Sequence, residues 1–262
     1  MDMRLKAEIE VIDQAWSDSV RVSMASVSIA AVTSLMLDCR CFRRGRCVEP
    51  APRRERQQGN NQMHAVRIHG RGGQGVVTAA ELLSLAAFTD GKHAQAFPSF
   101  GSERMGAPVM AFCRIDDQAI RTRESVTHPD VVIVQDLTLL HHVDVFGGLS
   151  ADGYLLINST FTVKELGIEE FLATLPGDHF CIIPASDIGQ KHLKRPIANT
   201  SLLGGFAAMT GLIRIASVES AIRHKFPGAL GEANAAAARE AYDHVTAFLS
   251  EQGRVSHHAR AN

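Results

Sequence analysis

The stretch His64–Phe88, with the sequence HAVRIHGRGGQGVVTAAELLSLAAF, decides the fold of this chain. A short apolar strand pattern at Val66–Ile68 leads into the glycine-rich loop Gly70–Gly75, and an alanine-rich apolar run then indicates a helix. Glycine permits backbone conformations that other residues avoid, and it lets a ligand approach the main chain. The helix directs unpaired N–H groups and partial positive charge at the loop, and Arg71 adds a permanent cation. We therefore expect this corner to hold a phosphate group.

The composition limits the classes of protein to consider. The 262 residues are enough for one large or two small domains with a sizeable core. The net charge of −1 argues against nucleic acid as the main partner, because binding phosphate backbones needs a local basic excess. Five cysteines without a regular framework suggest a reducing compartment. No apolar run has the length of a transmembrane helix, so we expect a soluble cytoplasmic α/β protein without a membrane partner.

Residues 1–62 differ in composition from the rest of the chain. A mildly apolar stretch interrupted by serines is followed by a run rich in arginine and proline, which predicts a poorly ordered extension. Acidic residues before the apolar stretch disfavour a secretory signal. Cys39, Cys41 and Cys47 have the spacing C-x-C-x5-C, which fits no common zinc or iron–sulfur pattern. Met63 is a candidate natural start, which the sequence alone leaves undecided.

From Met63 onward the pattern alternates between strands and helices. Apolar runs bounded by turn residues predict strands at Ala65–His69, Ala107–Ile115, Val131–Val134, Tyr154–Asn158 and Phe180–Pro184. Helices are expected at Val76–Phe88, Val163–Leu175, Asn199–Ile215, Ser217–Lys225 and Glu232–Glu251. Thr162 is the expected cap of the second helix, and Asn199 with Thr200 that of the third.

This alternation implies right-handed crossovers and defines the expected architecture. We predict an α/β, Rossmann-like fold, in which a mostly parallel sheet carries helices on both faces and the C-terminal helices pack on it. The folded domain would span residues 63–252, and residues 253–262 would form a polar tail.

The glycine loop also matches the dinucleotide fingerprint G-x-G-x-x-G at Gly70, Gly72 and Gly75, which alone is a weak signal. A dinucleotide site also needs an acidic residue about 20 residues later to bind the ribose. Asp90 is the candidate, and its surroundings match poorly. An independent NAD-binding dehydrogenase is therefore one hypothesis, weakened by the lack of a catalytic His–Asp or Tyr–Lys pairing.

The segment Gln95–Pro108, with the sequence QAFPSFGSERMGAP, is the more specific signal. One interpretation is an irregular loop with an exposed ion pair, which contributes little to stability. The other is a rigid surface that shapes a ligand channel or a subunit contact with Phe97, Phe100, Glu103 and Arg104. The second interpretation is favoured when this segment is considered together with the glycine loop.

Taken together, these motifs resemble the gamma subunit of pyruvate:ferredoxin oxidoreductase, and more broadly the gamma domain of the 2-oxoacid:acceptor oxidoreductases. The motifs occur in order over about residues 63–245: GRGGQGVVTAAELL, QAFPSFGSERMGAPVMAFCRI, the aspartate of VVIVQD and the start of the ANTSLLGG helix. Family members often carry a second arginine in the E-R-R-G-A-P stretch, where this chain has Met105. This departure puts one anion or salt-bridge contact in doubt. The F-P-x-F-G form favours pyruvate over 2-oxoglutarate.

The resemblance implies a division of work among alpha, beta, gamma and delta subunits or fused domains. In this family a 2-oxoacid is decarboxylated on thiamine diphosphate, the acyl group passes to coenzyme A, and electrons leave through iron–sulfur clusters to ferredoxin. Thiamine diphosphate and Mg would belong to alpha and beta, and the clusters to delta. The gamma chain would bind no cofactor alone, would carry no catalytic residue, and would share a coenzyme A site with its partners.

The residues of this chain agree with that division. The sequence contains no C-x2-C-x2-C run for an iron–sulfur cluster and no G-D-G…N pattern for thiamine diphosphate. Cys113 and Cys181 lie in or beside apolar strands, where buried thiols are the ordinary expectation. His64, His69 and the pair His141–His142 lack an acidic partner at useful spacing, so core or surface roles are expected.

At the shared site we expect Arg71 to supply charge and Gln74 an amide hydrogen bond to coenzyme A. Backbone donors would come from the loop glycines: Gly70, Gly72, Gly73 and Gly75. Two alternatives stay open. The loop could pack only against a partner subunit in a purely structural role, or the chain could serve a related oxidoreductase of 2-oxoisovalerate or indolepyruvate.

Overall fold

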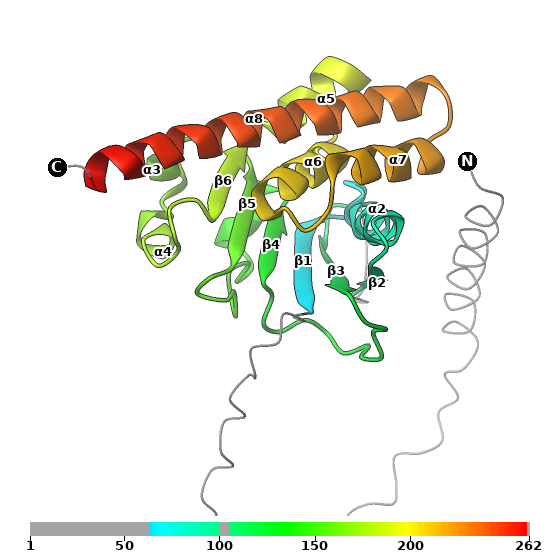
Figure 1. Cartoon of the computed structure of the whole chain (residues 1–262), viewed down its shortest axis with the longest axis horizontal. Helices are drawn as coiled ribbons and strands as arrows, with labels where there is room; N and C mark the ends of the chain where they lie inside the picture. The colour runs from blue at the N-terminus through cyan, green and yellow to red at the C-terminus, as the bar shows by residue number, and fades with distance from the viewer. Residues whose placement is uncertain (1–62, 100–104, 261–262) are drawn as a thin grey trace, which may run out of the picture. The chain divides into compact units, whose positions relative to one another are not determined.

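The computed structural model describes residues 63–99 and 105–260, which contain a six-stranded sheet and the helices packed on it (Figure 1). The strands are β1 (His64–Arg71), β2 (His93–Pro98), β3 (Pro108–Asp116), β4 (Val131–Val134), β5 (Tyr154–Asn158) and β6 (Phe180–Ile183). Their order in the sheet is β2-β3-β1-β4-β5-β6. Strands β1, β4, β5 and β6 run parallel, whereas β3 is antiparallel to both β1 and β2. The predicted α/β class with a mostly parallel sheet is confirmed.

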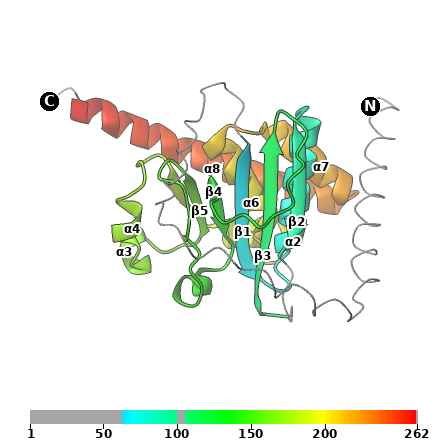
Figure 2. The same ribbon diagram turned by 90° about the horizontal axis from the view of Figure 1, so that it is seen from below.

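The helices lie on both faces of this sheet, and the longer ones lie on one face. They are α2 (Val76–Thr89), the 3-10 helix η1 (Leu137–His141), α3 (Val163–Leu166), α4 (Glu169–Leu172), α5 (Ala185–Leu193), α6 (Asn199–Thr210), α7 (Ile215–Lys225) and α8 (Ala229–Arg260). The main hydrophobic core joins the sheet to α2, α6, α7 and α8. A smaller core joins the other face of β4 and β5 to η1, α3 and α4. In Figure 2, α3 and α4 lie at the left of the view and α7 at the right.

The run Val131–Val134 shows why the central strands are buried on both sides. Side chains alternate across a strand. Val131 and Ile133 accordingly enter the main core, while Val132 and Val134 enter the smaller one. A continuous apolar run without polar alternation is typical of a parallel strand covered on both faces.

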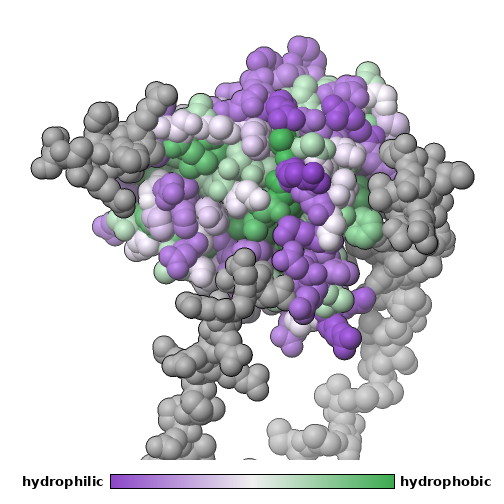
Figure 3. Space-filling model, in the orientation of Figure 1, coloured by the Kyte–Doolittle hydropathy of each residue, from purple (hydrophilic) through white to green (hydrophobic). Residues whose placement is uncertain are grey.

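Helix α8 covers much of the apolar surface on the main-core side. In Figure 3, hydrophilic side chains gather along the upper edge over α5 and α8, and hydrophobic ones are visible beneath α8. Among the described residues, none of the helices combines the length and the apolar composition that a membrane span requires.

Several helix boundaries differ from those expected from the sequence. The predicted helix Val163–Leu175 is split into α3 and α4, because Gly167 takes a φ of 65° and ends the first one. The Thr162 cap is confirmed, with a capping box to Glu165. The predicted helix Asn199–Ile215 ends at Thr210, since Gly211 has a φ of 62°, and α8 continues beyond the predicted end to Arg260.

Strand β2 was not expected. The segment predicted to be irregular begins as an edge strand that pairs only with β3. Pro98 ends this strand, in keeping with the preference of proline for strand ends and sheet edges. The apolar pattern of this segment is short and is interrupted by polar Gln95. It was therefore too weak to predict a strand.

Helix α6 is held unusually close to α8. A Cβ atom on Gly204 would lie 1.9 Å from the carbonyl oxygen of Ala238, and one on Gly205 would lie 2.3 Å from Cδ1 of Ile183. The glycines therefore permit α6 to lie between α8 and the sheet.

We expect Gly204→Ala to lower the free energy of unfolding by about 1–3 kcal/mol, because the new methyl group meets backbone that has to shift. Urea unfolding of the full chain, followed by circular dichroism, measures this change. Gly177→Ala is the control, since a Cβ there meets nothing within 4 Å. Equal stability of the two variants would contradict the close packing of α6 on α8.

Candidate functional site

The glycine loop leaves the carboxyl end of β1 and enters α2. Gly73 has a φ of 96° and Gly75 a φ of 74°, in the left-handed region that favours glycine. A Cβ on Gly75 would lie 2.5 Å from Nδ2 of Asn199, and one on Gly70 would lie 2.5 Å from Cγ2 of Val76. Gly70 and Gly75 are thus required by the local packing, whatever the loop binds, whereas at Gly73 only the positive φ favours glycine.

The first turn of α2 offers unpaired donors. The first hydrogen bond along the helix joins the N–H of Ala79 to the carbonyl oxygen of Gly75 at 2.9 Å. No described residue accepts from the backbone N–H groups of Val76, Val77 or Thr78, and no side chain caps this end. Such groups, together with the helix dipole, favour an anion at this position.

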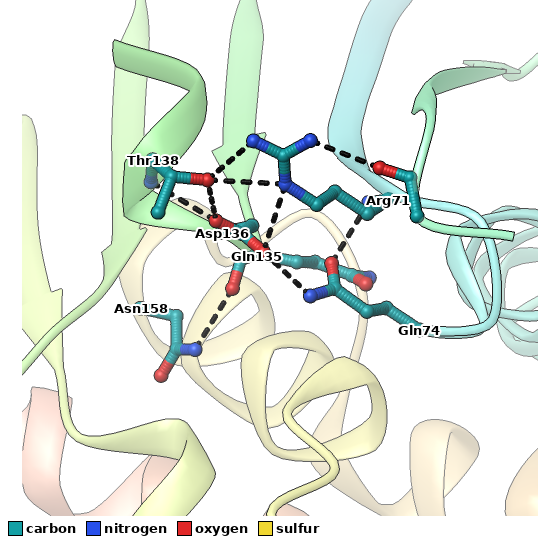
Figure 4. A network of polar contacts seen from close by, with 7 residues as sticks. Arg71, Gln74, Gln135, Asp136, Thr138 and Asn158 are labelled. Carbon is teal, nitrogen blue, oxygen red and sulfur yellow. Dashed lines mark hydrogen bonds and ion pairs between the residues drawn. The ribbon is translucent and has the colours of Figure 1, made fainter. Parts of the chain in front are cut away.

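Arg71 is engaged within the protein rather than extended from it (Figure 4). Its Nε and Nη2 atoms donate to Oγ1 of Thr138 at 3.0 and 2.6 Å, and Nη1 donates to the carbonyl oxygen of Gly106 at 2.9 Å. Its Nε lies 3.4 Å from Oδ2 of Asp136. The positive charge of Arg71 is therefore largely compensated by a neighbouring carboxylate.

Gln74 is likewise committed to its neighbours. Its Oε1 accepts from the N–H of Arg71 at 2.8 Å, and its Nε2 donates to Oδ2 of Asp136 at 2.7 Å. The backbone N–H and the hydroxyl of Thr138 both donate to Oδ1 of Asp136, at 2.9 and 2.5 Å. We call Arg71, Gln74, Asp136 and Thr138 the Asp136 network.

The Asp136 carboxylate stays ionised at neutral pH. Partial burial alone would raise its pKa. The hydrogen bonds from Thr138 and Gln74 and the charge of Arg71 outweigh this effect and hold the pKa of Asp136 below its ordinary value.

The network joins three segments that are distant in the sequence. Arg71 ends β1, Asp136 and Thr138 follow β4, and Gly106 precedes β3. Backbone bonds from Gly72 to Ala107 at 2.9 Å and from Gly106 to Gly72 at 3.1 Å reinforce the contact. Strands β1 and β4 are parallel neighbours, and α2 and η1, which follow them, lie on opposite faces. The site thus lies at a topological switch point, where open α/β sheets bind ligands.

The residues behind the network form a buried polar layer. Nδ2 of Asn158 donates to the carbonyl oxygen of Gln135 and to Oγ of Ser186, both at 2.8 Å (Figure 4). Gln135 is buried, and no described residue pairs with either of its amide atoms. The carboxyl ends of β4 and β5 are therefore polar, although the strands themselves are apolar.

Thr138, Gln135, Asn158 and Gly106 were missed by sequence reasoning. The resemblance included the aspartate of VVIVQD, which is Asp136, without assigning it a role. The available signal was positional, because polar residues directly after buried parallel strands gather at one edge of the sheet.

Of the other predicted contact residues, one lies on β2 and the rest lie outside the residues that the structure describes. Phe97 is on β2, with its ring centroid 5.3 Å from that of Phe112 and 5.0 Å from the guanidinium carbon of Arg114. Phe100, Glu103 and Arg104 lie outside the described residues, as do Cys39, Cys41 and Cys47. The proposed cap of α6 is wrong, because Ala198 occupies the N-cap and Thr200 instead donates to Oδ1 of Asn234 at 3.0 Å.

Asp90 does not take the place of a ribose-binding acid. It follows the last residue of α2 rather than a strand, and its Oδ1 accepts from Nε of Arg214 at 2.7 Å and from the hydroxyl of Ser217. The carboxylate therefore fastens α2 to the start of α7. This geometry removes the main support for a dinucleotide site.

Several ionisable side chains outside the loop are enclosed by the protein. Burial and the charge of Arg67 lower the pKa of His69 to about 4, so this imidazole is neutral at pH 7. Nη2 of Arg67 donates to the carbonyl oxygens of Val145 and Gly147 at 3.1 and 2.6 Å. Burial raises the pKa of the Cys113 thiol, and that of Cys181 to about 12. No cluster of three or more His, Cys, Asp or Glu residues suited to a metal ion occurs in the described part of the chain.

Comparison with known proteins places these features in a family. Residues 65–244 match the pyruvate ferredoxin/flavodoxin oxidoreductase family. The chain belongs to this family. It is 51% identical over 183 residues to pyruvate synthase subunit PorC of Methanothermobacter marburgensis, covering 69% of this chain and 97% of that relative. The predicted gamma-subunit resemblance is thereby confirmed.

Further relatives agree with this family. The common gamma subunit of the pyruvate/ketoisovalerate oxidoreductases of Pyrococcus abyssi is 48% identical over 186 residues, covering 71% of this chain and 99% of that protein. The crystal structure of pyruvate oxidoreductase subunit PORC from Thermotoga maritima is similar with a TM-score of 0.58 and 37% identity, covering 69% of this chain and 96% of that one. Matches of this kind make the chain a gamma-type subunit of a 2-oxoacid oxidoreductase.

The Asp136 network predicts a pH-dependent contribution to the stability of this gamma-type subunit. Because the folded-state pKa of Asp136 is lowered, its contribution is complete above the ordinary value of 3.8 and is lost as the pH falls through the folded-state pKa. We expect Asp136→Asn to lower the free energy of unfolding by about 1–2 kcal/mol at pH 7.

Urea unfolding of both proteins between pH 7 and pH 3 measures this difference, which should be constant down to about pH 5 and shrink below about pH 4. Asp152→Asn, at an exposed position, is the control. A difference that grows on acidification would show that the carboxylate is not stabilised by its neighbours.

Proposed function

We propose that this chain is the gamma subunit of a pyruvate:ferredoxin oxidoreductase. The complex would convert pyruvate and coenzyme A to acetyl-CoA and CO2 and pass the electrons to ferredoxin. The observation that carries this proposal is the identity of 51% to a pyruvate synthase subunit over nearly the whole length of that relative. The proposed partners are alpha, beta and delta subunits or fused equivalents, in the cytoplasm that the sequence predicts.

Within this complex, the glycine loop is the proposed contact to coenzyme A. The phosphates of coenzyme A require hydrogen-bond donors at close range, and a glycine loop at a helix start supplies them without side chains in the way. Gly73 is exposed, and the N–H groups of Val76, Val77 and Thr78 have no acceptor among the described residues. These features support binding of a phosphate by the main chain.

The roles of Arg71 and Gln74 in this proposal differ from those expected from the sequence. Both side chains are bound to Asp136, so neither is free to bind a phosphate directly without giving up those contacts. We assign them to holding the loop in shape, with Arg71 also fixing the Gly106 carbonyl. The loop glycines keep their proposed role as backbone donors or as close-contact positions: Gly70, Gly72, Gly73 and Gly75.

The chemistry of decarboxylation is assigned to the partners. Thiamine diphosphate with Mg and the iron–sulfur clusters would supply carbanion stabilisation and electron transfer there. This chain would bind part of coenzyme A and orient it toward the partner subunits, and none of its residues is proposed as catalytic.

A broader substrate range is the second candidate function. The Pyrococcus abyssi relative is described as a subunit common to pyruvate and ketoisovalerate oxidoreductases. A gamma chain shared between two complexes is consistent with the oxoacid being selected elsewhere. This chain could therefore serve a related 2-oxoacid oxidoreductase, or act in assembly only.

Co-expression of this chain with candidate alpha, beta and delta subunits tests the proposed function. We expect the four chains to co-purify and to reduce ferredoxin when pyruvate and coenzyme A are both present. The same assay with 2-oxoisovalerate and indolepyruvate separates the alternatives. A chain that purifies alone and reduces NAD would overturn the proposal.

The proposed coenzyme A contact predicts a charge effect at Gly73. Aspartate and asparagine both tolerate positive φ and have the same shape, so they differ mainly in charge. We expect Gly73→Asp to raise the KM for coenzyme A about tenfold relative to Gly73→Asn, because the carboxylate repels the phosphates. The KM for pyruvate should be the same in both complexes.

Steady-state kinetics of the two assembled complexes measure the effect, and raising the salt concentration should reduce it. Equal KM values for coenzyme A would indicate that the loop contacts a partner subunit and no phosphate.

A further inference from the structure

The smaller core carries an open groove on the sheet face opposite α6 and α8. Two adjoining cavities of about 270 and 320 Å³ lie between η1 and the short helices α3 and α4. Leu140, His141 and Leu166 line both of them, so the two form one continuous groove. Its apolar lining is provided by Leu137, Leu140, Phe146, Phe161, Leu166 and Phe171.

These apolar side chains are incompletely covered. Phe161 is 50% exposed, and Leu140, Leu166 and Phe171 are only half-buried. Phe171 stacks on Phe146, with ring centroids 4.3 Å apart, so the floor of the groove is aromatic and preformed. Apolar surface of this kind gains free energy when a partner removes it from water.

Apart from His141, the ionisable side chains that line the groove are acidic. Glu165 lines one cavity and Glu170 the other, whereas no lysine or arginine of the described residues lines either. Lys164 neighbours Glu165 in the sequence but is not part of the lining. Hydrogen bonds from the backbone and hydroxyl of Thr162 fix the Glu165 carboxylate and hold its pKa below the ordinary value. The rim is therefore negatively charged at neutral pH.

We propose that this groove docks a segment of another subunit of the complex, one that presents apolar side chains flanked by lysine or arginine. The inference rests on the proposed role of the chain as a subunit. Apolar side chains would fill the two cavities, and the flanking cations would lie against Glu165 and Glu170. A symmetric contact with a second copy is disfavoured, because it would bring two acidic rims together.

The groove is connected to the Asp136 network through η1. Thr138 accepts hydrogen bonds from Arg71, while Leu137 and Leu140 on the same short helix face the groove. A segment docked in the groove would therefore pack on the element that positions Arg71.

Two variants test the two parts of the recognition. Phe161→Ser removes the exposed apolar contact, and Glu170→Lys reverses the charge at the rim. The matched controls are Leu230→Ser, at a leucine that is 56% exposed on α8, and Asp152→Lys, at an exposed carboxylate. The readout is the dissociation constant of the full chain for the purified complex of the other subunits. Melting temperatures establish that each variant is folded.

We expect each groove variant to weaken binding about tenfold and each control to change it less than about twofold. The effect of Glu170→Lys should shrink as the salt concentration rises. Unchanged affinity of both groove variants would overturn the docking site while leaving the subunit proposal intact. Tighter binding by Glu170→Lys would overturn the basic character of the segment.

Two further outcomes would overturn the inference, one by assigning the groove to a different occupant and one by contradicting the proposed function. A dimer of the isolated chain that Phe161→Ser disrupts would assign the groove to a second copy and overturn the inference. A wild-type chain that binds none of the other subunits would overturn the proposed function and this inference with it.

Discussion

The Asp136 carboxylate is the interaction on which the candidate site depends. A single partly buried acceptor collects donors from Gln74 and Thr138 and compensates the charge of Arg71. Arg71 then reaches the Gly106 carbonyl, so the segment before β3 is held against the glycine loop. Because hydrogen bonds to a charged acceptor are stronger than neutral ones, one carboxylate can define the relative positions of three segments.

This arrangement changes the interpretation of a basic residue beside a glycine loop. A cation next to such a loop suggests direct electrostatic binding of phosphate, but here the cation is paired within the chain. In the proposed coenzyme A contact, the loop would rely on the oriented N–H groups at the start of α2, whose dipole is not neutralised by an acidic residue in its first turn. Such a contact through the main chain would depend on backbone geometry, which the glycines at positive φ, Gly73 and Gly75, help to set.

Much of the fold follows from the sequence, because it depends on local patterns. Val131–Val134 and Tyr154–Asn158 have the predicted bounds, since continuous apolar runs between turn residues leave little choice. Strand β2 was missed because an edge strand is half exposed and its pattern is weak. For the site, the glycines were recognisable from their spacing. The bond between Arg71 and Gly106 was not, because it arises only when distant segments meet across the sheet.

The close contact between α6 and α8 also bears on how the chain is made. Ala235, Ala237, Ala238, Ala241 and Val245 of α8 belong to the main core, and Ala238 lies directly against Gly204. These residues are translated last among those of the core, so a nascent chain emerging from the ribosome carries α6 with one side uncovered. The main core closes only once α8 has left the exit tunnel.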